Sequence, residues 1–127
     1  MLSLRFTQKE GCDIHGTPAE LRAISEKIQQ IAAAGRGSHS FPADTSISPD
    51  PYDRALSRLI VRATTGPVCA TVDGDTLTVE AGKDFLVGFA SFFNFSEHTP
   101  HGAHYHHDYW EGNEDVSPKS VALVIGV

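Results

Sequence analysis

The fold is decided by residues 14–24, which read IHGTPAELRAI and lead from the end of an apolar strand into the start of a helix. Thr17 stands before Pro18, and Glu20 follows Thr17 at the spacing of a capping box, in which two side chains satisfy free amides of the first turn. Apolar residues then recur at helical spacing as far as a glycine suited to end the helix. The pattern predicts a helix over residues 18–34.

The same passage recurs 65 positions later, where residues 79–89 read VEAGKDFLVGF. The two stretches match at their apolar positions, and apolar strands at 59–61 and 123–125 match at an offset one residue shorter. The matched apolar pairs are Ile14/Val79, Leu21/Leu86, Ile24/Phe89 and Ile28/Phe93. A repeat of about 60 residues buries too little surface to be stable alone. We therefore expect one domain, 1–127, made of two structural repeats, 1–65 and 66–127.

Strands are expected on both sides of each helix. Alternating apolar residues predict one hairpin within residues 2–14 and a second around the Asp73-Gly74 turn. The second helix is expected from about Lys83 to Phe93. Further strands are expected at 39–41, 56–63, 103–109 and 120–127. The order β-β-α-β-β in each half predicts an α+β fold, with one mainly antiparallel sheet and two helices on one face.

The charge of the chain is divided unevenly between its halves. Residues 1–65 hold eight Lys or Arg and seven Asp or Glu, a net +1, whereas residues 66–127 hold two and nine, a net −7. An acidic half repels nucleic acid and attracts basic protein surfaces. No apolar run is long enough for a membrane helix, and the first residues lack the pattern of a signal peptide, so we expect a cytoplasmic protein without membrane contact.

The two cysteines, Cys12 and Cys69, form no metal-spaced pair and do not occupy equivalent positions of the repeat. We expect both to be free, buried thiols. The phenylalanines are also unevenly placed, because five of the seven fall within residues 85–95. Such a stripe is most often part of a core, and it can also form a homodimer or partner interface.

Residues 98–108 contain five of the seven histidines. On a strand, His104, His106 and Asp108 point the same way, which allows a metal site, with zinc as the metal. His39 aligns with His104 in the repeat and is the best additional ligand. A small metal-binding protein or metal-dependent enzyme is therefore one alternative, and the other is that these histidines are polar surface that hydrogen-bonds a partner.

An aromatic and acidic segment overlaps the end of this histidine cluster. Tyr and Trp anchors beside carboxylates suit recognition of a basic protein surface. The candidate partner-binding residues are His107, Asp108, Tyr109, Trp110, Glu111, Glu114 and Asp115. No Gly-x-Ser-x-Gly elbow and no glycine-rich phosphate loop occurs, so we expect no catalytic residue and no cofactor.

Residues 14–24, together with 104–109 followed by 117–125, resemble the immunity proteins of bacterial polymorphic toxin systems, most nearly immunity protein family 32. The resemblance implies an α+β protein that binds and neutralises a cognate toxin and catalyses nothing itself. The leading hypothesis is therefore an immunity protein that occludes the active site of a toxin through its acidic second half. An oligomerising structural domain built on the phenylalanine-rich helix is a further alternative.

Overall fold

The chain forms an α+β fold of two helices and two mixed sheets, as the sequence predicts, in a computed structural model that describes all 127 residues. The first half contains β1 (Ser3–Thr7), β2 (Gly11–His15), α1 (Pro18–Ala34), β3 (Ser38–Pro42), β4 (Arg54–Leu56) and β5 (Arg58–Ala63). The second half contains β6 (Cys69–Asp73), β7 (Thr76–Ala81), α2 (Lys83–Ser91), β8 (His104–His107) and β9 (Leu123–Gly126). Both predicted hairpins are present, as β1 with β2 and as β6 with β7.

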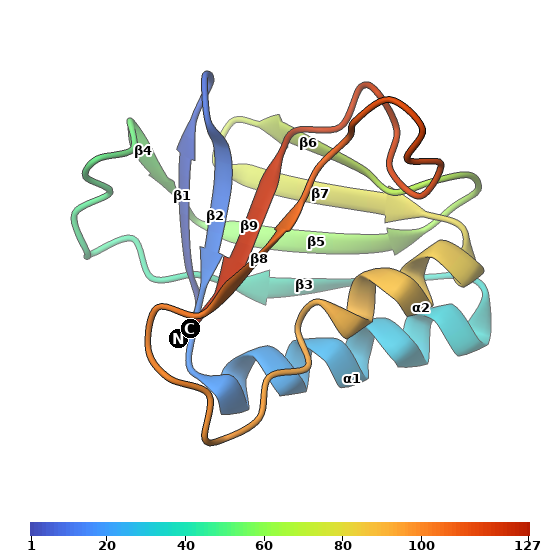
Figure 1. The fold of residues 1–127 in the computed structure, drawn as a ribbon, viewed down its shortest axis with the longest axis horizontal. Helices are drawn as coiled ribbons and strands as arrows, with labels where there is room; N and C mark the ends of the chain where they lie inside the picture. The colour runs from blue at the N-terminus through green and yellow to red at the C-terminus, as the bar shows by residue number, and fades with distance from the viewer.

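The prediction of one sheet is wrong, because the strands form two. One sheet has the order β4-β1-β2-β9-β8 and the other β3-β5-β7-β6, and Figure 1 shows their strands running across each other. The predicted strand 56–63 is divided at Ser57 into β4 and β5. The backbone of Ser57 donates to the Asp75 carbonyl and accepts from the Ala43 amide, which takes it out of either ladder. The chain therefore changes sheets at this residue.

Each sheet combines the hairpin of one half with two strands of the other. β2 pairs in parallel with β9, and Ile14 lies opposite Ile125. β7 pairs in parallel with β5, and Val79 lies opposite Val61. The sequence repeat matches Ile14 with Val79, and it matches Val61 with Ile125. The parallel pair of strands in one sheet therefore has the same register as the parallel pair in the other.

The strands that follow the two helices, β3 and β8, correct the alignment of the repeat at this point. His39 on β3 lies opposite Val61, whereas Tyr105 on β8 lies opposite Ile125. The pairing thus makes Tyr105, and not His104, the equivalent of His39. By the same shift, the buried Phe41 corresponds to the buried His107. A histidine therefore occupies a position that is apolar in the other half.

The helix ends follow from local sequence. The Thr17 side chain accepts from the Glu20 amide at 3.1 Å, the Glu20 carboxylate accepts from the Thr17 amide at 2.8 Å, and Gly35 ends α1 in a left-handed conformation. α2 ends at Ser91, slightly before the predicted Phe93, and has no side-chain cap at its start. The helices pack side by side (Figure 1), and the buried Ser25 hydroxyl donates to the Ala90 carbonyl at 2.8 Å.

One core of 27 buried apolar residues runs through both halves. Of the five phenylalanines within residues 85–95, Phe89, Phe93 and Phe95 lie in that core, whereas Phe85 and Phe92 are half-buried beside it. Neither helix is long and apolar enough to cross a membrane.

Both cysteines are free, as predicted. Only Cys12 is fully buried, since Cys69 is partly exposed, which corrects half of that prediction. Burial, with a smaller contribution from Asp13, raises the pKa of the Cys12 thiol to about 12. Cys12 is therefore an unreactive thiol of the core.

Candidate partner-binding site

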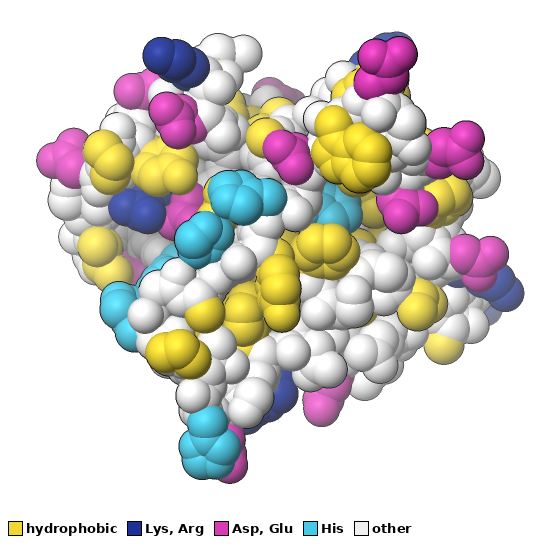
Figure 2. Space-filling view, in the orientation of Figure 1, with side chains coloured by type: hydrophobic (Ala, Val, Ile, Leu, Met, Phe, Trp, Pro, Cys, Tyr) yellow, Lys and Arg dark blue, Asp and Glu magenta, His cyan; other side chains and the backbone are white.

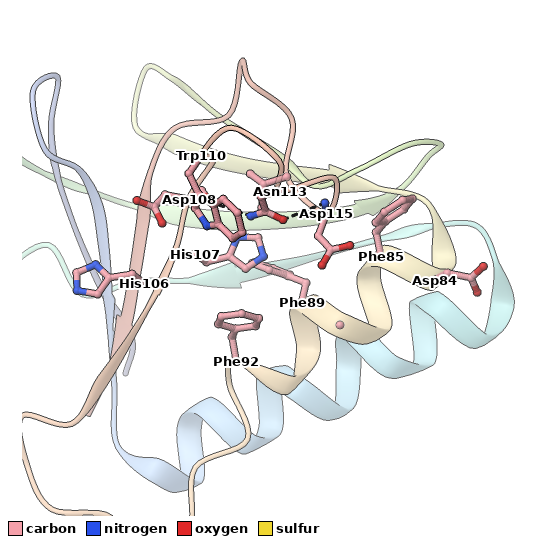
Figure 3. Close-up of a pocket in the computed structure, with 12 residues that line it drawn as sticks. Asp84, Phe85, Phe89, Phe92, His106, His107, Asp108, Trp110, Asn113 and Asp115 are labelled. Atoms are coloured by element: carbon pink, nitrogen blue, oxygen red, sulfur yellow. Dashed lines mark hydrogen bonds between the residues drawn. The ribbon is translucent and has the colours of Figure 1, made fainter.

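A pocket of about 440 Å³ opens between α2, β8 and the segment that follows β8 (Figure 3). We call it the α2 pocket and call residues 108–116 the 108–116 loop. On the helix side, the α2 pocket is lined by residues of α2 and of its C-terminal end, which are Asp84, Phe85, Gly88, Phe89 and Phe92. Its lining from β8 and the loop is His106, His107, Asp108, Trp110, Asn113, Asp115 and Val116. The helix side thus supplies three phenylalanines, and the β8 and loop side supplies most of the polar side chains together with Trp110.

His107 is the buried polar group of this pocket, with only 5% of its surface exposed. Its ring meets Phe89 at 5.0 Å and Phe92 at 4.6 Å between centroids, both edge to face. Figure 3 shows the ring in the middle of the lining side chains. Its Nδ1 atom is buried and has no hydrogen-bond partner. Such an orphaned atom is unusual in a folded protein.

Burial lowers the pKa of His107 below its ordinary value. The influences of its own backbone and of the Asp108 and Asp115 carboxylates act in the opposite direction and are smaller. The ring is therefore neutral at pH 7. A neutral imidazole offers one nitrogen as a donor and the other as an acceptor.

The 108–116 loop is held by hydrogen bonds of its own. The Asn113 side chain donates to the Asp108 carbonyl at 3.1 Å and accepts from the Asp115 amide at 3.1 Å. The loop is also fixed to the strand edge at Val68, whose amide donates to the Asp115 carbonyl at 2.9 Å. These bonds present the Trp110 side chain, 62% exposed, on a constrained support.

The pocket carries negative charge without a compensating cation. Asp84, Asp108 and Asp115 line it, and none of them takes part in an ion pair. No Lys or Arg lines it. Figure 2 shows acidic side chains beside exposed hydrophobic side chains on this face of the molecule. The electrostatic environment therefore favours a positively charged group.

The structure divides the seven predicted partner-binding residues into two groups. His107, Asp108, Trp110 and Asp115 line the α2 pocket. Tyr109, Glu111 and Glu114 are exposed on the same loop outside the pocket lining. His107 lies inside the pocket and not on the outer surface that the sequence suggested, because the register of β8 turns its side chain inward.

The sequence did not indicate that α2 forms the other wall. Phe85, Phe92 and Asp84 reach the pocket only because α2 packs close to β8. The cluster of phenylalanines was the available signal, since a partner interface was one of its two interpretations. A stripe on one helix cannot show which distant loop it faces.

The predicted metal ligands are not assembled. His104 and His106 lie on β8 with ring centroids 5.1 Å apart, and the His104 Nδ1 atom is hydrogen-bonded to the Gly102 carbonyl at 2.9 Å. His39 lies on β3 in the other sheet. Nowhere in the chain do three His, Cys, Asp or Glu side chains gather in a way that could hold a metal ion. The structure therefore does not bring the four residues together as one set of ligands.

Comparison with known proteins gives a family match. The family model described as Immunity protein 32 matches residues 13–44 and 76–127, about two thirds of the chain. The first matched segment begins within β2 and includes α1 and β3, and the second begins at β7 and includes α2, β8 and β9. No curated protein and no solved structure matches.

Proposed function

Because the chain belongs to the Immunity protein 32 family, we propose that it is a cytoplasmic immunity protein that binds a cognate bacterial toxin and neutralises it. The binding surface in this proposal is the 108–116 loop together with the α2 pocket. The toxin's active site is occluded by this contact, and no reaction is catalysed. Nucleic acid and membranes are not partners.

The observation that carries the proposal is the exposed aromatic and acidic surface of the loop. Trp110 and Tyr109 are 62% and 41% exposed, although large aromatic side chains are usually covered. Trp and Tyr dominate the energetic centres of protein interfaces. Carboxylates around them accelerate capture of a basic partner, and the buried aromatic contacts slow its release.

The chemistry of the pocket favours binding over catalysis. Its lining contains no Ser, Thr, Cys, Lys or Tyr that could serve as a nucleophile. His107, its buried histidine, has no carboxylate on Nδ1 to orient it as a general base. These features support a recognition role for the site.

The test is survival of bacteria that express the toxic domain encoded beside this gene, with and without this chain, followed by co-purification of the pair. Rescue with a stable complex is the expected result. Growth arrest in the presence of the intact chain, with no complex, would contradict the proposed function.

A double substitution tests the surface itself. Trp110→Ala with Glu111→Lys removes the exposed anchor and reverses a nearby charge, so toxin affinity and protection should both fall. The matched control is Ile47→Ala with Glu10→Lys, which makes the same kind of change at exposed residues of the other half. Equal affinity of both double variants would rule out the proposed surface, and circular dichroism checks that both remain folded.

A further inference from the structure

We propose that the α2 pocket receives an arginine side chain from the surface of the toxin. This inference rests on the proposed function and names the chemistry of the partner. Its carriers are the unpartnered Nδ1 atom of His107, the three unpaired carboxylates and the aromatic wall of α2. Each is explained by a guanidinium group in the pocket.

The buried histidine can accept a hydrogen bond from a ligand in the pocket. Nδ1 of His107 lacks a partner within the chain, and the neutral ring can offer it as an acceptor. A guanidinium has five N–H donors and no acceptor, so it can satisfy this nitrogen and a carboxylate together. A purely apolar side chain would leave the nitrogen unpaired, and the negative charge of the pocket disfavours an acidic one.

The aromatic side chains that line the α2 pocket indicate a planar cation. Phe85, Phe92 and Trp110 present aromatic surface to the pocket, and Arg stacks on aromatic faces more readily than the strongly hydrated ammonium of Lys. The Asp115 carboxylate points from the loop toward the helix side of the pocket, whereas Asp84 lies near the start of α2 with its carboxylate directed away from His107 (Figure 3). The charge, the acceptors and the stacking surface therefore suit one guanidinium.

The other half of the chain provides an internal comparison. A second cavity lies between α1 and β3 and includes the residues 65 positions before the α2 wall. These equivalents are Glu20, Ala23, Ile24 and Lys27, in place of Phe85, Gly88, Phe89 and Phe92. There, Phe41 replaces His107, and Lys27 supplies a cation in place of an aromatic wall. The buried acceptor and the aromatic wall are thus particular to the α2 pocket.

The experiment titrates the full chain, labelled with nitrogen-15, with butylguanidinium, butylammonium and the neutral butylurea. We expect butylguanidinium to bind with a dissociation constant on the order of 1 mM, as suits a small fragment. The Nδ1 resonance of His107 and the indole resonance of Trp110 should shift together and saturate, whereas resonances of Phe41 and Ala23 should not move. Butylammonium should bind more weakly, and butylurea should cause no saturable shift.

Two variants and one control localise the binding. Asp115→Asn should weaken butylguanidinium binding about fivefold, the effect of one exposed charge pair. Glu10→Gln removes an exposed charge between β1 and β2, outside the proposed binding surface, and should change the constant less than about twofold. His107→Phe copies Phe41 of the other half, so it should preserve the fold and weaken binding about tenfold through loss of the acceptor.

The outcomes distinguish this inference from the proposed function. Absence of a saturable shift with butylguanidinium, or an equal shift with butylurea, would overturn the arginine pocket even if the toxin complex forms. Saturable binding that Asp115→Asn and His107→Phe leave unchanged would overturn it as well. Binding that both variants weaken supports the pocket, and it does so independently of whether the neighbouring toxin is the partner.

Discussion

Cutting the chain between Thr65 and Gly66 should abolish the monomeric fold of both products, 1–65 and 66–127. The cut separates β2 from β9, β7 from β5 and α1 from α2. Each fragment keeps its hairpin and its helix but loses the strands that complete both sheets. The prediction that 1–127 is a single domain depends on this interlocking.

The expected loss of stability of each fragment follows from the composition of the core. Its 27 residues comprise 14 from the first half and 13 from the second, so neither half has a core of its own. Burying such a side chain fully stabilises the fold by about 1.5–3 kcal/mol, as an upper estimate. If each core residue loses half of its burial, a fragment loses on the order of 10 kcal/mol. This loss is comparable to the whole stability of an ordinary domain, about 5–15 kcal/mol.

The assay compares the purified fragments, their equimolar mixture and the intact chain. Each fragment alone should lack a cooperative guanidinium chloride transition as a monomer, as judged by circular dichroism and light scattering. The mixture should recover the spectrum of the intact chain as a one-to-one complex. The intact chain should unfold in one transition.

A circular permutant is the matched control, because the terminal residues Met1 and Val127 line the same cavity and the two ends of the chain meet in Figure 1. Joining them through a short linker and opening the chain between Thr65 and Gly66 breaks the same bond but keeps all strands in one molecule. The permutant should fold. A monomeric 1–65 fragment that unfolds cooperatively would refute the reasoning, since the halves would then be independent domains.

Four further predictions concern single sites. Thr17→Ala removes the cap of α1 and should lower the free energy of unfolding by about 1 kcal/mol in urea titrations, whereas Thr65→Ala, an exposed threonine outside both helices, should have little effect. Because burial lowers the pKa of His107, the unfolded chain binds a proton on this histidine at higher pH than the folded chain does. The free energy of unfolding should therefore decrease as the pH falls below 6.5. In melts between pH 8 and pH 5, the His107→Phe variant should lack this part of the decrease. In native protein at pH 8 a thiol reagent should modify Cys69 but not Cys12, whose buried thiol has a pKa of about 12, and modification of both without denaturant would contradict the structure. In urea titrations, Gly11→Ala should lower the free energy of unfolding by more than about 2 kcal/mol, because Gly11 has φ +91° and an added Cβ would collide with the Ala122 carbonyl. Gly74→Ala is the control, since Gly74 has φ +59° and open space around it, and it should lower the free energy of unfolding by about 1 kcal/mol.

Local sequence predicted the elements whose stabilising groups are close in the chain. The capping box at Thr17 and Glu20 and the turn at Asp73-Gly74 each complete their hydrogen bonds within a few residues. The helix 18–34 and both hairpins therefore agree with the structure. The family resemblance also came from local passages, and the family match supports it.

Pairing between distant strands decided what the sequence left open. The break at Ser57 depends on partners at Ala43 and Asp75, so the apolar run 56–63 alone could not predict two sheets. The equivalence of His39 with Tyr105 depends on the register against β5 and β9, and a shift of one residue reverses the face of every side chain on a strand.

In the candidate site, too, some features follow from the sequence and others only from the tertiary structure. The sequence by itself determined that residues 107–115 are acidic and aromatic, because composition is a property of the segment alone. Only the tertiary structure decided that His107 is buried with a free nitrogen and that Phe85 and Phe92 form the opposite wall. Burial and proximity depend on packing between elements far apart in the chain, whereas helix caps and tight turns depend on neighbours in sequence.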